Sequence, residues 1–204
     1  QFVAERVPLD LIVNAIITLE GQIYQCVAGH AVQAHRVGVE HARSVFGTPV
    51  RRRYPVVVAN CYPYDVDWWQ SFKGAMCGDL VTAPGGTLVL VSAAPEGHST
   101  YPLVPHYTSR DLDELQGEIE AGQVEDVKQA VAGVITARLK ERVNLVLVSD
   151  GLTATDARTM GITYFDSVEA AVSDAVAGLP EAEQAGSVAI IPQAGIILPI
   201  VNTE

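Results

Sequence analysis

Three uninterrupted apolar runs constrain the fold more than any other feature of this sequence. They are Val56–Asn60, Leu88–Ser92 and Leu145–Ser149. None of them alternates between apolar and polar residues, so a strand formed from any of them must be buried on both faces, as in a parallel sheet covered by helices. We therefore predict that these runs are adjoining central parallel strands.

Helical patterns separate the three runs and give an alternating order of strands and helices. The predicted helices are Trp68–Val81, Leu112–Ala121, Val124–Arg142 and Ser167–Leu179, and further strands are predicted near Ile162–Phe165 and through Ser187–Ile191 and Ile196–Val201. This alternation predicts an α/β fold of three layers, in which helices cover both faces of a mainly parallel sheet.

The N-terminal segment has a different pattern. Leu11–Leu19 and Ile23–Ala28 are rich in β-forming residues and are joined by the turn residues Glu20-Gly21-Gln22. They predict a β-hairpin, which we expect at an edge of the sheet, followed by a helix from Val32 to Arg43. Because the chain has neither an internal repeat nor a low-complexity linker, we predict a single domain over residues 1–204.

Charge and cysteine usage limit the classes of function. The chain has 13 Lys and Arg against 24 Asp and Glu, a net charge of −11, and this surface would repel nucleic-acid phosphates. Cys26, Cys61 and Cys77 have no C-x-x-C spacing, which argues against a disulfide framework and a zinc knuckle and predicts a cytoplasmic protein. No apolar run reaches the ~20 residues of a membrane span.

The segment after the first apolar run carries the strongest candidate site. Ligands of open α/β sheets bind outside the carboxyl ends of the strands. Asp65 or Asp67 can cap the next helix, and Gln70 and Lys73 then share one helical face near its N-terminus. Such a face suits a carboxylate or a phosphate. The same spacing is also typical of a capped helix with two solvated polar residues, which the spacing alone favours without excluding a binding site.

The other two loops at this edge are less informative. His98 follows the Leu88–Ser92 run, and it could act as an acid or base, since the ordinary pKa of histidine is near neutrality, or simply face water. The segment Ser149–Thr153 predicts an ordinary turn with a helix cap at Thr153 or Thr155.

Several familiar motifs are missing. His30, His35 and His41 are five and six residues apart, which does not give the i, i+4 pair of a helical metal site, so we predict no metal site in this chain. The sequence also lacks a G-x-x-x-x-G-K-[ST] phosphate loop, a G-x-S-x-G nucleophile turn and a G-x-G-x-x-G dinucleotide motif.

An ordered set of short motifs nevertheless resembles the C-terminal domain of the lactate racemase family. The similar segments, in chain order, are Gly29–Val39, Cys61–Asp65, Trp69–Gly74, Pro84–Gly86, Glu96–His98, Leu147–Ser149, Met160–Ile162, Ser167–Ala171 and Ile191–Gly195. Each is weak by itself, but together they span nearly the whole chain in the family's order.

The resemblance implies an enzyme of two domains around a cleft. In this family a nickel-pincer nucleotide, attached through a lysine of the N-terminal domain, accepts a hydride from Cα of a 2-hydroxy acid and returns it to either face. Histidines of that domain ligate the nickel and act as acid and base. The chain starts at Gln1 without methionine. We therefore expect the C-terminal half of such an enzyme, inactive without its own N-terminal domain and holding no cofactor by itself.

The resemblance also implies site residues. Gln70 and Lys73 match the family's Y-Q-x-x-K motif and are the expected catalytic residues, while Trp69, Gln70, Lys73 and His98 are the expected substrate-binding residues. Trp69 stands where the family often has tyrosine, so a phenolic hydroxyl is replaced by a larger indole. The Val124–Arg142 helix also lacks a tryptophan that relatives tend to carry. Both departures argue for a 2-hydroxy acid other than lactate.

A second class of function remains open at the level of the sequence. The chain could be a non-catalytic α/β module that binds a small anion or a partner protein. The sequence does not determine the 2-hydroxy acid, the stereochemistry or the oligomeric state, a homodimer included.

Overall fold

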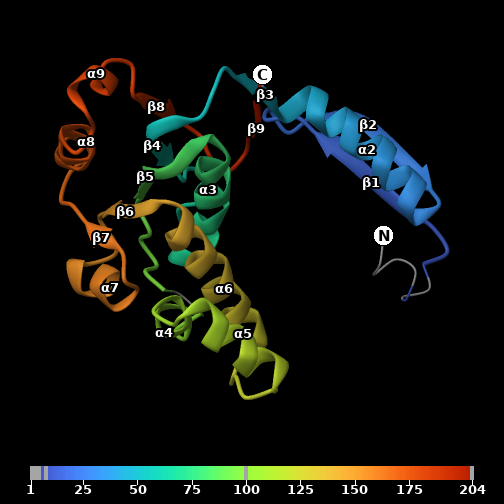
Figure 1. The fold of residues 1–204 in the computed structure, drawn as a ribbon. Helices are drawn as coiled ribbons and strands as arrows, with labels where there is room; N and C mark the ends of the chain where they lie inside the picture. Colours follow the sequence, from blue (N-terminus) through green and yellow to red (C-terminus); the bar gives the residue numbers. More distant parts are fainter. Residues whose placement is uncertain (1–5, 7–8, 99–100, 203–204) are drawn as a thin grey trace. The chain divides into compact units, whose positions relative to one another are not determined.

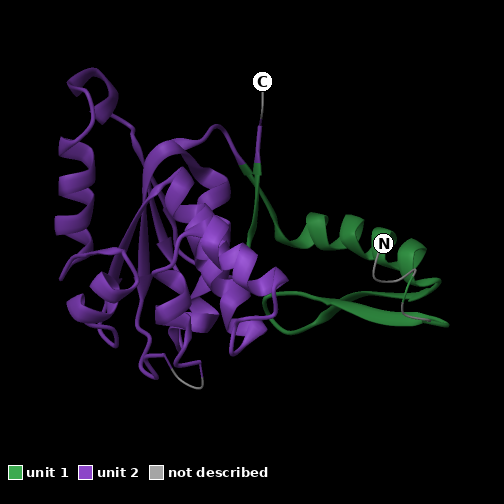
Figure 2. Ribbon diagram, turned by 60° about the horizontal axis from the view of Figure 1, so that its bottom comes forward, with its two compact units in different colours: residues 1–49, 196–200 green, residues 50–195, 201–204 purple. Residues whose placement is uncertain are grey.

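The computed structural model describes residue 6 and residues 9–98 and 101–202 of the chain. The chain separates into two compact units, residues 1–49 with 196–200 and residues 50–195 with 201–204 (Figure 2). The sequence predicts a single domain, and within the chain the N-terminal hairpin and its helix bury a small core of their own. Ile16, Val27, Ala31 and Ala34 are buried in that first unit.

The second unit is built on a five-stranded parallel sheet in the order β7-β6-β5-β4-β8 (Figure 1). The strands are β4 (Tyr54–Asn60), β5 (Thr82–Ser92), β6 (Asn144–Ser149), β7 (Thr163–Tyr164) and β8 (Val188–Ile191). The three apolar runs lie in β4, β5 and β6, the adjoining central strands. In their two pairings, Val57 lies opposite Leu88 and Leu88 lies opposite Leu145. The central prediction of the sequence analysis is confirmed.

Helices cover both faces of this sheet. They are α3 (Trp68–Val81), α4 (Val104–Thr108), α5 (Leu112–Glu120), α6 (Val127–Arg142), α7 (Ala154–Thr159), α8 (Val168–Ala177) and α9 (Glu181–Gln184). On one face, Ala171 of α8 packs in a cluster with Val58, Val89 and Val146. On the other face, α3 lies close enough to β5 for Gly78 to approach the Leu88 side chain. The predicted three-layer α/β architecture is therefore confirmed (Figure 1).

The first unit contains the predicted hairpin and helix. Strands β1 (Ile12–Ile17) and β2 (Ile23–Gly29) pair antiparallel and are followed by α2 (Ala31–Phe46). The predicted position of the hairpin at an edge of the main sheet is wrong, because the two strands form a separate sheet and β7 and β8 occupy the edges. The apolar side of the hairpin is covered by α2 instead, where Gly38 lies against Val27.

The two C-terminal strands have different partners. β8 joins the main sheet beside β4, whereas β9 (Leu198–Val201) pairs with β3 (Gly47–Val50). Among the helices that the structure describes, none is long and apolar enough to cross a membrane.

Candidate functional site

The loops that follow β4 and β5 are joined by backbone hydrogen bonds at the carboxyl edge of the sheet. The Ala94 N–H donates to the Asp65 carbonyl at 2.8 Å, and the Trp68 N–H donates to the Gly97 carbonyl at 2.9 Å. These bonds satisfy backbone groups at the start of α3, where helical partners are lacking. They also fix the position of that helix relative to the loop that carries His98.

Asp67 is the residue that caps α3. Its buried carboxylate accepts a hydrogen bond from the Gln70 N–H at 2.6 Å, which decides between the two predicted caps. In the next turn, the Ser71 hydroxyl lies 2.7 Å from the hydroxyl of Ser92 at the end of β5, and both side chains are buried. The N-terminal turn of α3 is therefore held by side chains as well as by backbone groups.

Gln70 and Lys73 lie side by side on this turn, as their spacing predicts. The Lys73 ammonium donates to Gln70 Oε1 and lies 3.9 Å from the centre of the Tyr64 ring. The Lys73 side chain is exposed, and among the described residues no carboxylate lies within ion-pair distance of it. This arrangement leaves a positive charge, held by a neutral amide and an aromatic face, at the carboxyl edge of the sheet.

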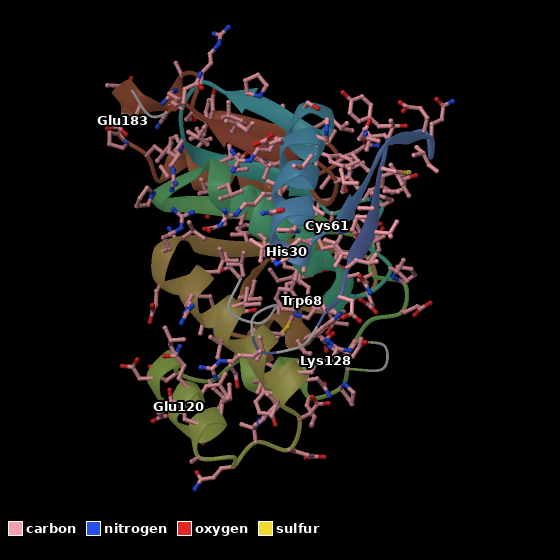
Figure 3. All side chains as sticks on the ribbon, turned by 90° about the vertical axis from the view of Figure 1, so that its right-hand side faces the viewer. His30, Cys61, Trp68, Glu120, Lys128 and Glu183 are labelled. Carbon is pink, nitrogen blue, oxygen red and sulfur yellow. The ribbon has the colours of Figure 1, made fainter. Side chains whose placement is uncertain are left out.

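Trp69 belongs to a second group on the same turn. Its indole stacks on the Tyr101 ring with centroids 4.5 Å apart. The Lys128 ammonium lies 5.0 Å from the indole centre and 4.3 Å from the Tyr101 centre, and it donates to the Tyr101 hydroxyl at 2.7 Å. Figure 3 marks Lys128, which comes from the first turn of α6, and Trp68, the neighbour of Trp69.

Three members of these groups, Tyr64, Tyr101 and Lys128, are not among the site residues predicted from the sequence. Tyr64 lies in the segment Cys61–Asp65, which is similar to the family, but no binding or catalytic role is predicted for it. Tyr101 and Lys128 come from segments that no motif connects with α3, and only the folded chain brings them to Trp69.

His98 is directed toward another element. Its Nε2 atom lies 3.4 Å from Asp156, and its buried Nδ1 atom has no hydrogen-bond partner among the residues that the structure describes. The Thr153 hydroxyl, together with His98, lowers the pKa of Asp156. Thr153 is the cap of α7, which decides between the two caps predicted there, and Asp156 completes a capping box with it. No hydrogen bond, ion pair or ring contact among the described residues joins His98 to Gln70 or Lys73.

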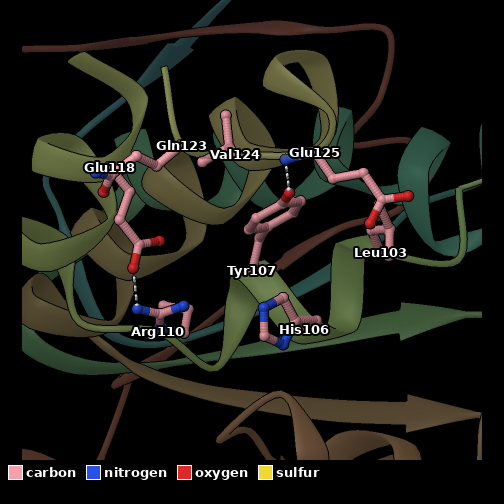
Figure 4. A pocket seen from close by; sticks show the side chains of 8 residues that line it. All are labelled: Leu103, His106, Tyr107, Arg110, Glu118, Gln123, Val124 and Glu125. Carbon is pink, nitrogen blue, oxygen red and sulfur yellow. Dashed lines mark hydrogen bonds and ion pairs between the residues drawn. The ribbon is translucent and has the colours of Figure 1, made fainter. Parts of the chain in front are cut away.

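A pocket of about 360 Å³ lies beyond this edge, between α4, α5 and the segment before α6 (Figure 4). Three of its polar side chains already have partners within the protein. Arg110 pairs with Glu118 at 2.5 Å, and the Tyr107 hydroxyl accepts a hydrogen bond from the Glu125 N–H at 3.0 Å. Arg110 is therefore ion-paired, unlike Lys73.

The described residues do not fit a nickel site. They contain no group of three or more His, Cys, Asp or Glu side chains that could hold a metal ion. Cys61 and Cys77 are buried, and burial raises the pKa of Cys61 to about 12 and that of Cys77 to about 11. Metals bind the thiolate form, so these two cysteines are poor ligands where they stand.

The same burial leads to a prediction on thiol reactivity. At pH 8 a thiol with a pKa near 12 is ionised to only about one part in ten thousand, and only the thiolate is nucleophilic. Iodoacetamide should therefore modify the exposed Cys26 in the native protein and spare Cys61 and Cys77, whereas all three should react in denaturant. Peptide mapping checks this, and rapid native labelling of Cys61 would contradict the packing described above.

Comparison with known proteins adds a family and a fold. The sequence model of a family described as the lactate racemase C-terminal domain matches residues 53–198. The lactate racemase of Thermoanaerobacterium thermosaccharolyticum is 24% identical over 152 residues, which cover 73% of this chain and 36% of that protein. The lactate racemase of Lactiplantibacillus plantarum is 23% identical over 203 residues, covering 97% and 47%. The chain thus spans less than half the length of these relatives.

Two solved structures share the fold. The lactate racemase apoprotein from T. thermosaccharolyticum matches with a TM-score of 0.78 at 20% identity, over 99% of this chain and 48% of that one. A protein from Thermotoga maritima matches with a TM-score of 0.60 at 15% identity, over 94% and 49%.

Proposed function

The chain belongs to the lactate racemase C-terminal domain family, and we propose that it forms the substrate-cleft half of a two-domain enzyme that racemises or epimerises a 2-hydroxy acid. The nickel-pincer nucleotide implied by the sequence resemblance would supply the hydride acceptor, held by the N-terminal domain. Since the described residues of this chain do not fit a nickel site, their part is to bind and orient the substrate. We also propose that the enzyme is cytoplasmic and that this half alone is inactive.

The pairing of Lys73 with Gln70 carries this proposal. Because Gln70 Oε1 accepts a hydrogen bond from Lys73, the NH₂ group of the same amide is left to donate to a ligand. The ammonium has further N–H donors, and the Tyr64 ring attracts its charge without neutralising it. A carboxylate can accept hydrogen bonds from both side chains, and bonds to charged groups are the stronger ones.

Holding the carboxylate serves the reaction by orientation. A 2-hydroxy acid fixed through its carboxylate can turn its Cα–H bond toward a hydride acceptor on the facing domain. Positioning of this kind contributes strongly to rate, because the entropy of alignment is lost on binding rather than in the chemical step. The capped and hydrogen-bonded turn of α3 supports this role, since it holds Gln70 and Lys73 on rigid backbone.

The alternative function uses the same residues without turnover. A non-catalytic module could bind a small anion at Lys73 and Gln70 and release it unchanged. The exposure of Lys73 favours neither function over the other.

Turnover by the full-length, nickel-loaded protein distinguishes the racemase or epimerase from the non-catalytic anion-binding module. A single enantiomer of lactate or another 2-hydroxy acid should be converted to its opposite enantiomer. Chiral chromatography measures this conversion. In D₂O the product should keep protium at Cα, because a hydride returned from an acceptor does not exchange as an abstracted proton does. Binding of these acids without conversion of any of them would support the anion-binding module instead.

A further inference from the structure

The chain contains only three lysines, one with a structural role and two that are exposed. Lys140 has a structural role: it donates to the carbonyls of Thr108 and Met160 at 2.7 and 3.1 Å. Lys73 and Lys128 both border Trp69, the first one helical turn further along α3 and the second 5.0 Å from the indole centre. Both of the exposed lysines therefore lie at the candidate substrate site.

No ion pair among the described residues accounts for the position of Lys128. Its ammonium contacts the Tyr101 hydroxyl and two aromatic rings, all of them neutral, and no carboxylate of the described residues lies within ion-pair distance. The nearby Asp126 is occupied as the cap of α6, where its oxygens accept from the Gln129 backbone and side chain at 3.0 and 2.8 Å. In a chain of net charge −11, this leaves a second exposed lysine without an ion pair among the described residues.

The geometry also keeps Lys128 in one place. Rings attract a cation over their faces, and the hydrogen bond to the Tyr101 hydroxyl restrains the end of an otherwise flexible side chain. A positive group that is already ordered loses less conformational entropy when it binds an anion. Because Trp69 and Lys73 are four residues apart, they are neighbours on the helix surface. Trp69 is therefore the residue that connects the two lysines on this surface.

We propose that Lys128, held by Trp69 and Tyr101, is a specificity residue that binds a second carboxylate of the substrate, so that the enzyme acts on a short 2-hydroxydicarboxylic acid. This rests on the proposed function, in which Lys73 and Gln70 bind the carboxylate next to the reacting Cα. Lys128 then binds the carboxylate at the far end of the molecule. Lactate, which ends in a methyl group, would leave Lys128 without a partner.

The test compares dicarboxylates with monocarboxylates in the full-length protein. Succinate and propanoate lack the 2-hydroxyl group, so they report binding without turnover, and 2-hydroxysuccinate and lactate report turnover. Succinate should bind at least about tenfold more tightly than propanoate. Lys128→Gln, which keeps a polar side chain one atom shorter and removes its charge, should abolish that difference and lower kcat/KM for 2-hydroxysuccinate by about tenfold or more. It should change kcat/KM for lactate by less than about threefold.

Two further variants control for charge and structure. Arg138→Gln removes an exposed cation from the same helix and should leave both substrates unaffected. Lys128→Arg keeps the charge over the rings and should retain part of the preference for the dicarboxylate.

The outcomes separate this inference from the proposed function. Racemisation of lactate with equal binding of succinate and propanoate would overturn the inference and leave the function standing. Equal losses for both substrates in Lys128→Gln would also overturn it, since Lys128 would then only support Trp69. Lys128-dependent succinate binding without racemisation of any 2-hydroxy acid would instead overturn the proposed function and uphold the second anion site.

Discussion

Replacing Lys73 with alanine in the full-length enzyme should lower kcat/KM for its 2-hydroxy acid by about two orders of magnitude or more. A lost hydrogen bond to a charged group costs roughly 1.5–3 kcal/mol, and the freed carboxylate would also let Cα–H leave its orientation toward the hydride acceptor. Gln70 remains in this variant, but it loses the ammonium that holds its side-chain oxygen. We therefore expect kcat to fall as well as KM to rise.

The fold should be unaffected by this change. Lys73 is exposed, its only described contacts are Gln70 and the Tyr64 ring, and alanine is a good helix former. Lys73→Arg should rescue the activity only in part, because the planar guanidinium is longer and directs its donors differently. Racemisation kinetics and thermal melting of the same preparations check both points. Activity within about threefold of wild type, with an unchanged melt, would show that Lys73 is a solvated surface residue.

The central sheet could be predicted because burial on both faces leaves a pattern that belongs to each strand alone. We could predict three central strands without knowing which strands pair with one another. They are Val56–Asn60, Leu88–Ser92 and Leu145–Ser149. The hairpin is different. Its β-forming residues and its turn predict two paired strands, but not which element covers them, and α2 covers them in place of the main sheet. Because α2 covers the hairpin, the two form a compact unit of their own.

The candidate site likewise contains residues that local sequence predicts and residues that only tertiary packing brings together. Gln70 and Lys73 could be paired from the sequence because both the cap at Asp67 and the shared helical face are local properties of α3. Tyr101 and Lys128 reach Trp69 through tertiary packing, for which a sequence pattern carries no signal. His98 could be placed at the edge of the sheet but not oriented.

Tight packing of α3 on β4 leads to the second large effect, which is expected from Gly74→Ala. Alanine within a helix should normally stabilise it by up to about 1 kcal/mol relative to glycine. At Gly74, however, an added Cβ would lie 2.6 Å from the Cys61 sulfur and 3.1 Å from the Cys61 Cα. Cys61 is fully buried at the end of β4, so neither atom has free space to move into. The helix must shift away from the strand.

We expect this overpacking to lower the free energy of unfolding by about 1–3 kcal/mol, which corresponds to about 2–4 °C in Tm per kcal/mol for a chain of this size. Since Gly74 follows Lys73 directly, the shift should also reduce kcat/KM in the folded enzyme. Gly117→Ala is the matched control: it changes a glycine inside α5 where an added Cβ meets nothing within 4 Å, and it should raise Tm slightly. Equal melting shifts for the two variants would refute the close contact between α3 and Cys61, and with it the argument that this contact positions Lys73 for the substrate.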